Sequence, residues 1–160
     1  MKKFFVLGLV FGFLSLSAAA QSPDKQPAPI DVVNQLFTEM AAANPDGIVA
    51  LQTADSQLFV IIKQNDGLIR TRTITAEAFS KNFTDKTRNL KEVMYDPKVE
   101  TDGEWAMVWG RYVFFLGGKI SHCGINQFNL IRTENGWKIA NGASTIDAGG
   151  CTEKEKAMKP

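Results

Sequence analysis

Five polar residues near the C-terminal end of the chain could do chemistry on a small molecule. His122 is the only histidine among the 160 residues, and imidazole titrates close to neutral pH, so it could act as a general acid or base. It could equally be a polar pocket residue that a neighbour satisfies. Arg111 and Asp147 could hold an anionic ligand group, or form a buried ion pair that closes the pocket. Asn126 and Thr145 could bind a ligand or only each other.

Two glycine-containing pairs predict how the strands that carry these residues are joined. Gly117-Gly118 and Asn135-Gly136 each match a two-residue hairpin turn, which requires positive φ angles. The chain from Glu104 to Ile146 is therefore expected to form three antiparallel strands. Because the length of a tight turn sets which residues pair, these turns also predict which side chains share a face.

The predicted pairing gathers the five polar residues on the inner face of the sheet. Arg111 pairs with Gly124, and Gly124 pairs with Asp147 on the next strand, so the two charged side chains could meet across the glycine. Trp105 and Trp109 would stand on the same face, as pocket wall or as ordinary core. An apolar pocket with a few convergent polar groups is the usual form of a small-molecule site. A single β-bulge would shift this register.

The two cysteines allow one internal disulfide. Cys123 is predicted on the outer face, where Cys151 could fold back to reach it and hold the end of the last strand; the alternative is two free thiols. Two cysteines and one histidine match no closed zinc site. We expect no metal and no cofactor.

The first twenty residues have the pattern of a secretory signal peptide. Lys2 and Lys3 precede an apolar run that is shorter than a membrane-spanning helix, and small residues end at Ala20. We expect cleavage after Ala20 and export to the periplasm or beyond, with no membrane anchor left after cleavage. Residues 21–29 then predict a flexible leader, because they are polar and rich in proline.

Residues 30–147 predict one folded domain. Apolar residues at helical spacing predict a helix that starts at Ile30 and ends at Asn44-Pro45, followed by a short helix to about Gln52. Strands are expected at 58–62, 68–73 and 90–101, and a third helix near Thr75. Residues 148–160 would form a tail that is disordered beyond Cys151. This order predicts an α+β fold, with about three N-terminal helices on one face of a curved, mainly antiparallel sheet.

This order of elements and the closing hairpin NLIRTENGWKIANGAS resemble the nuclear transport factor 2-like superfamily, and within it the exported SnoaL-like branch. The resemblance covers about Ile30 to Asp147. It implies a cone-shaped fold with a cavity between helices and sheet, and often a homodimer packed through the outer face of the sheet. Catalytic members often place a carboxylate in the first strand, and the run from Leu58 to Ile62 has none. The superfamily contains enzymes and binding modules, so the resemblance alone predicts no reaction.

Three functions fit these observations. The first is an exported accessory module that binds a small, partly apolar ligand, with Arg111 near an anionic group. The second is a cyclase-, dehydratase- or isomerase-type enzyme, in which His122 moves a proton and Asp147 orients it. The third is an interaction subunit. The near-neutral net charge of +1, without a basic block, does not favour nucleic acid as a partner. The third function and the homodimer rest on an apolar outer face, predicted to carry Val108, Tyr112, Phe114, Leu116, Ile125 and Ile131.

Overall fold

The computed structural model describes residues 27–64, 66–147 and 149–160. The predicted signal peptide and most of the predicted leader lie outside these residues. In the described part of the chain, no helix is long and apolar enough to span a membrane.

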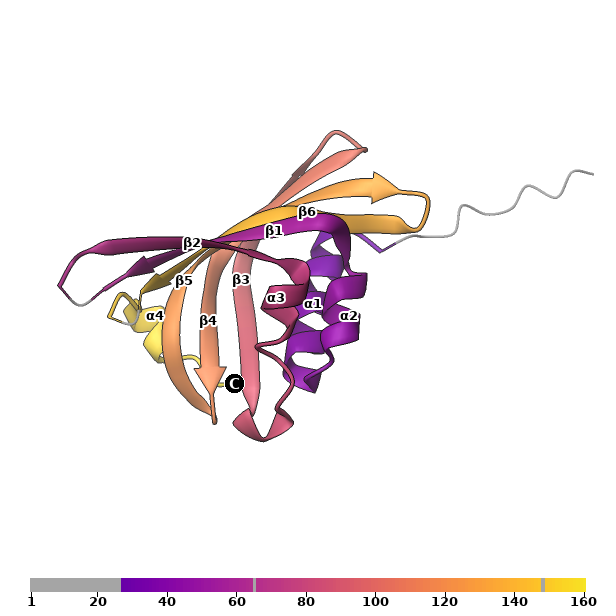
Figure 1. Ribbon diagram of the computed structural model, residues 1–160. Helices are drawn as coiled ribbons and strands as arrows, with labels where there is room; N and C mark the ends of the chain where they lie inside the picture. The colour runs from indigo at the N-terminus through magenta and orange to yellow at the C-terminus, as the bar shows by residue number, and fades with distance from the viewer. Residues whose placement is uncertain (1–26, 65, 148) are drawn as a thin grey trace, which may run out of the picture.

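Three helices pack against one face of a strongly curved six-stranded sheet (Figure 1). The strand order is β2-β1-β6-β5-β4-β3, and every pair of neighbours is antiparallel except β1 with β6. The predicted α+β architecture is confirmed. The strands are β1 (Gln52–Lys63), β2 (Ile69–Thr75), β3 (Leu90–Thr101), β4 (Trp105–Leu116), β5 (Lys119–Thr133) and β6 (Gly136–Asp147).

The first two helices on the concave face begin and end within two residues of the predicted bounds, and a third follows Thr75, as predicted. Pro29 opens the first helix, and Ala43 ends it in the left-handed conformation. Asn44 caps the second helix, since its side-chain oxygen accepts a hydrogen bond from the Gly47 backbone N–H at 3.2 Å. These helices are α1 (Pro29–Ala42), α2 (Pro45–Ala50), α3 (Ala76–Ser80) and the 3-10 turn η1 (Lys86–Arg88).

The main hydrophobic core lies between α1 and the inner face of the sheet. One stripe of α1 is buried there, including Val33, Phe37 and Met40, as the helical spacing predicts. The sheet contributes Ala106 and Val108 from β4, followed by Phe128, Leu130, Trp137 and Ile139 from β5 and β6.

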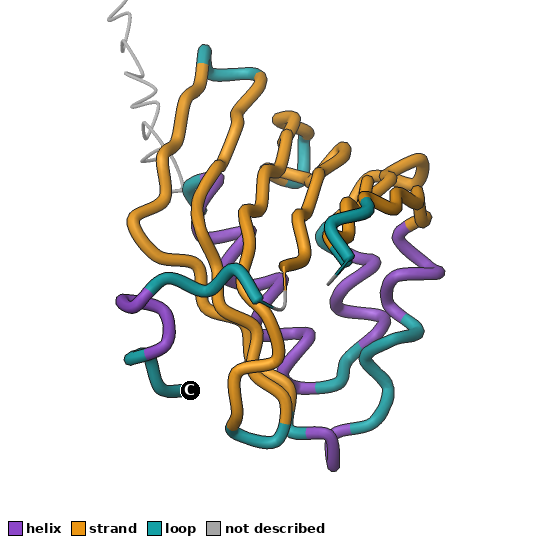
Figure 2. Tube along the Cα trace, turned by 90° about the vertical axis from the view of Figure 1, so that its left-hand side faces the viewer, coloured by secondary structure: helices purple, strands orange, loops and turns teal. Residues whose placement is uncertain are grey.

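The C-terminal tail is ordered, which corrects the predicted disorder beyond Cys151. Helix α4 (Glu153–Lys156) lies on the other face of the sheet from α1, α2 and α3 (Figures 1 and 2). The predicted Cys123–Cys151 disulfide is present, with the two Cα atoms 5.2 Å apart. A second apolar cluster forms beneath the tail from Val113, Phe115 and Cys123, with Cys151 and Met158 packed against it.

Candidate functional site

The face of strand β4 that lies toward the helices is the opposite of the predicted one. The first predicted turn is present, and Phe115 pairs with Ile120. The next pair is Phe114 with His122, so Ser121 forms a β-bulge. Because side chains alternate along a strand, this one extra residue exchanges the faces of β4 relative to β5.

The exchange moves Arg111, Trp105 and Trp109 to the outer face, which corrects their predicted place in the pocket. The Trp105 side chain is 43% exposed, and Lys98 Nζ lies 5.8 Å from the centre of the Trp109 ring. The same exchange removes the β4 residues from the predicted outer patch. Val108, Tyr112 and Phe114 belong to the inner face, where they pack in the core or line a cavity.

Strand β6 also differs in register. Its turn is Glu134-Asn135 rather than Asn135-Gly136, since Thr133 pairs with Gly136, and a second bulge follows at Ala140. Gly136 has a φ of 93°, as in hairpins where a glycine follows the turn. The sequence therefore identified the hairpin correctly but placed its turn one residue too far along the chain.

Thr145 and Asp147 consequently lie on the outer face, away from the predicted cluster. Asp147 Oδ2 forms an ion pair with Lys63 Nζ at 3.4 Å, and Thr145 Oγ1 accepts a hydrogen bond from the Ile125 backbone N–H at 2.8 Å. His122 lines the inner face, as predicted, but the predicted His122–Asp147 pair does not form. Of the five residues, the structure brings only His122 and Asn126 to the helix-covered face.

Two adjoining cavities lie between this inner face and the helices. Their volumes are about 220 Å³ and about 50 Å³. Residues that line both are Met40, Leu58, Phe79, Glu92 and Ser144. The larger cavity is further lined by apolar Val60, Ile74, Phe83, Leu90, Phe114 and Ile146, and by polar Arg72, Asn82, Arg88, Tyr112 and His122.

A chain of three polar side chains connects the strands beneath the cavities. Ser144 Oγ donates a hydrogen bond to Asn126 Oδ1 at 2.6 Å, and Asn126 Nδ2 donates one to Glu92 Oε1 at 2.5 Å. Asn126 is 2% exposed, so both ends of its amide need partners inside the protein. The chain leaves Glu92 Oε2 and further capacity on Ser144 for a molecule in the cavity.

Glu92 is the one carboxyl among the residues that line the larger cavity, and its pKa is shifted to near neutrality. Burial raises the pKa of its carboxyl to about 7, against the hydrogen bond from Asn126, which favours the charged form. At neutral pH this carboxyl therefore exists in both protonation states, and it can donate or accept a hydrogen bond or a proton.

The fold of this site is shared with solved structures of low sequence identity. Rv3472 from Mycobacterium tuberculosis, a protein of unknown function, has 18% identity and a TM-score of 0.58, with 81% of this chain and 78% of that chain covered. A nuclear transport factor 2-like protein with a cystatin-like fold from Novosphingobium aromaticivorans has 13% identity and a TM-score of 0.58, over 79% and 83% of the two chains. A nuclear transport factor 2-like protein of unknown function from Shewanella baltica has 12% identity and a TM-score of 0.55, over 74% and 90%. This chain has the nuclear transport factor 2-like fold. No family model matches the sequence, and no curated protein matches it.

In this nuclear transport factor 2-like sheet, Gly124 permits one side chain to cross between strands. Tyr112 reaches from β4 over Gly124 and donates a hydrogen bond to the Thr145 carbonyl oxygen at 2.8 Å. A Cβ on residue 124 would lie 1.9 Å from that oxygen and 2.9 Å from the Tyr112 ring. Burial, followed by the charge of Glu92, raises the pKa of the Tyr112 hydroxyl. The sequence predicted a crossing at this glycine but assigned it to Arg111.

His122 lies flat against an aromatic wall of the larger cavity. Its ring stacks on Phe114 with centroids 4.9 Å apart and meets the Tyr112 ring edge-on at 5.7 Å. Burial lowers the pKa of the imidazole, so the ring is neutral at pH 7. Its Nδ1 lies 3.2 Å from Ser121 Oγ in the bulge. Residue 122 thus offers the cavity a neutral, hydrogen-bonding ring.

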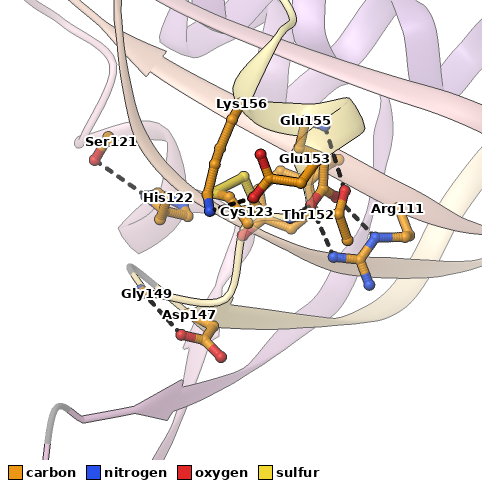
Figure 3. The surroundings of a disulfide bond; sticks show 12 residues. Arg111, Ser121, His122, Cys123, Asp147, Gly149, Thr152, Glu153, Glu155 and Lys156 are labelled. Atoms are coloured by element: carbon orange, nitrogen blue, oxygen red, sulfur yellow. Dashed lines mark hydrogen bonds and ion pairs between the residues drawn. A yellow bond between two sulfur atoms is a disulfide. The ribbon is translucent and has the colours of Figure 1, made fainter.

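Arg111 has a different partner from the predicted one, on the outer face. It forms two hydrogen bonds with Glu155 of α4, from Nε at 2.7 Å and from Nη2 at 3.0 Å (Figure 3). Burial opposes the charged form of Glu155, but hydrogen bonds from Arg111, the Thr152 backbone N–H and Tyr95 outweigh it and lower the pKa of this carboxyl to about 2. With the adjacent disulfide, this ion pair fastens the tail to the sheet.

The sequence did not predict Glu92, Ser144, Arg72 or Arg88 at the site. For Glu92 a signal existed, because Leu90, Glu92 and Met94 alternate in a strand and the two apolar residues pack in or against the core. Ser144 was missed because the bulge at Ala140 exchanges the faces of β6. Nothing in the spacing of Arg72 or Arg88 along the chain indicates a cavity.

Proposed function

We propose that this protein is an exported module that binds a small, partly apolar ligand in the larger cavity. The observation that carries the proposal is the hydrogen-bonded chain of Ser144, Asn126 and Glu92 beside a cavity that also has a large apolar wall. A few hydrogen-bonding groups in an apolar wall orient a ligand, while the wall supplies most of the binding free energy. In this proposal, the polar groups that orient the ligand are those at Glu92, whereas the sequence predicted them at Arg111.

The cavity volume limits the size of the ligand. An apolar cavity of about 150 Å³ can hold benzene. A cavity of about 220 Å³ therefore suits one ring with short substituents, or an aliphatic chain of similar size. Larger ligands would require the short helix α3 or the turn η1 to move.

Binding can be tested with 4-methylbenzamide, a neutral ring compound with one hydrogen-bonding end. Saturation-transfer NMR on the folded protein should detect it, and calorimetry should give the dissociation constant. Leu58→Trp should abolish binding, because Leu58 lines both cavities. Phe59→Trp is the matched control, since the neighbouring Phe59 is 43% exposed and lines neither cavity. Equal binding to the two variants would contradict the proposed site.

Export is supported by the signal pattern of residues 1–20 and is compatible with the disulfide. We expect the protein in the exported fraction of the expressing cell to begin at Gln21. Intact mass spectrometry measures this directly, because removal of twenty residues changes the mass unmistakably. Recovery of the full-length chain from the cytoplasmic fraction alone would contradict export.

A second candidate function is acid–base catalysis, favoured by the pKa of about 7 at Glu92. The Glu92 carboxylate would take a proton from the carbon beside a ligand carbonyl and return it to the resulting enolate. In D₂O this step should exchange the α-hydrogens of cyclohexanone for deuterium, measured by NMR. Glu92→Gln should abolish the exchange. A rate equal to that of buffer with the wild-type protein would exclude this chemistry for such ketones.

A further inference from the structure

Two arginines at the larger cavity remain without a described anionic partner. Arg72 lies on β2, opposite Val60 of β1, and Arg88 lies in η1. Both line the same cavity, although they come from separate elements. Within the described residues 27–64, 66–147 and 149–160, neither forms an ion pair.

We propose that Arg72 and Arg88 bind the carboxylate of the ligand, so that this module is selective for a small apolar monocarboxylate. The inference rests on the proposed binding function and names the chemical class of its ligand. The carboxylate would lie between the two guanidinium groups. The apolar body would lie against Leu58, Ile74 and Phe114, with its far end toward Glu92 and Ser144.

The charges that face the cavity favour an anion. Besides the two arginines, its titratable lining residues are Glu92, Tyr112 and His122. Tyr112 and His122 are neutral at pH 7, because burial shifts each pKa away from the charged form. Glu92 is only partly ionised, so the two guanidinium charges dominate. An arginine side chain matches a carboxylate with two parallel N–H donors.

A hydrogen bond restrains the exposed Arg88 side chain before any ligand binds. Its Nη1 donates a hydrogen bond to the Asn82 carbonyl oxygen at 3.0 Å. Asn82 in turn donates from Nδ2 to the carbonyl oxygens of Ala78 at 3.2 Å and Phe79 at 2.9 Å, at the end of α3. An arginine held in this way loses less side-chain entropy when it binds a ligand. The apolar wall favours an organic carboxylate over free phosphate, which would leave that wall without a partner.

The experiment compares 4-methylbenzoate with its neutral isostere 4-methylbenzamide by calorimetry at pH 7.5. The wild-type protein should bind the carboxylate about tenfold more tightly, since charge-assisted hydrogen bonds contribute more than neutral ones. Arg72→Gln should remove most of this selectivity and leave amide binding unchanged. Arg88→Gln should do the same, and Arg72→Gln decides the question if loss of the bond to Asn82 unfolds the Arg88 variant.

Arg70→Gln is the matched control. Arg70 lies two residues away on the same strand and is exposed, but it donates to Gln64 Oε1 at 3.0 Å and does not line the cavity. This variant changes the net charge equally and should keep full selectivity. If it loses selectivity as Arg72→Gln does, only the general charge of the protein matters and the proposal is wrong.

The remaining outcomes separate the inference from the proposed function. If amide and carboxylate bind equally to the wild type, the proposed binding function is supported and the proposed selectivity for carboxylates is wrong. If neither compound binds, the binding function and the selectivity are both wrong for ligands of this size. Inorganic phosphate at the same concentration should not compete with the carboxylate; full competition would assign the arginines to a phosphate ion instead.

Discussion

At the residue scale, Glu92 joins the cavity to the stability of the fold. Its pKa in the folded protein, about 7, is above the usual 4.5, so the folded state holds the proton more tightly than the unfolded state does. The stability that comes from this difference is complete below about pH 4.5 and is lost as the pH rises to about 7. Above that pH the protein carries a partly buried charge with a single amide partner.

Replacement of Glu92 by glutamine should therefore stabilise the protein at alkaline pH. Glutamine keeps an oxygen that can accept from Asn126, and it cannot ionise. We expect Glu92→Gln to raise the free energy of unfolding at pH 8 by about 2–3 kcal/mol and to have little effect at pH 4.5. Urea denaturation across this pH range measures both values.

Glu134→Gln controls for the general effect of removing one negative charge, because Glu134 lies exposed in the β5–β6 turn. It should change the stability by less than about 0.5 kcal/mol at either pH. A Glu92→Gln variant that is less stable than wild type at pH 8 would show that the charged carboxylate is well solvated or better paired than the geometry indicates.

At the element scale, strand β4 shows how much of the site could be predicted from the sequence. The order of helices and strands, both hairpins and the disulfide followed from spacing and turn residues. The sequence did not identify the inner face of β4, because large apolar residues occupy both faces. Trp105, Trp109 and Phe115 lie on one face, and Val108 and Phe114 lie on the other. Alternation identifies a buried face only where the other face is polar.

The second apolar face of β4 exists because the tail covers part of it. Val113 and Phe115 are buried beneath Cys151 and Met158, and the sequence predicted disorder beyond Cys151. The bulges at Ser121 and Ala140 were equally beyond prediction, since a bulge costs little locally and its position depends on which face the whole sheet buries. These two bulges account for the wrong faces assigned to Arg111, Thr145 and Asp147.

The ion pair beneath α4 should be essential for the position of the tail. The Glu155 side chain is fully buried, so Arg111→Ala leaves a buried carboxylate without its main partner. Such a loss typically costs about 3 kcal/mol or more. We expect this variant to be destabilised to that extent in urea denaturation, and the tail to become sensitive to proteases with the disulfide intact.

The same ion pair gives an acid-side prediction with the opposite sign to that of Glu92. Because the pKa of Glu155 is lowered to about 2, its contribution to stability is complete above about pH 4.5 and is lost as the pH falls toward 2. Arg111→Ala should flatten this part of the stability curve. Lys154→Ala is the control, since the Lys154–Asp96 pair is exposed and should contribute less than about 1 kcal/mol.

At the scale of the whole molecule, the outer face of the sheet is only partly covered by its own chain. The tail covers one end, near Cys123. At the other end Trp105 pairs directly with Ile131 across β4 and β5, and these side chains are 43% and 37% exposed. Phe59 of β1 adds a third exposed apolar side chain on the same face. Exposed apolar side chains on one face of a sheet are typical of a surface that meets a partner.

We therefore expect a homodimer through this uncovered end, rather than through the whole outer face. Trp105→Lys would place a charge in the contact and should weaken the dimer at least about tenfold. Sedimentation velocity over a wide range of protein concentration measures the change. Leu68→Lys is the control: Leu68 is 60% exposed, but it lies in the β1–β2 hairpin turn, away from Trp105 and Ile131.

The cavity opens on the opposite face of the sheet from this contact, so dimerisation and ligand binding should be separable. Trp105→Lys should bind 4-methylbenzamide with the wild-type dissociation constant, and Leu58→Trp should dimerise normally. A wild-type protein that stays monomeric at every concentration would contradict the dimer. A Trp105→Lys variant that loses ligand binding while it remains folded would instead show that the two faces are coupled, and that the curvature of the sheet responds to what covers its outer side.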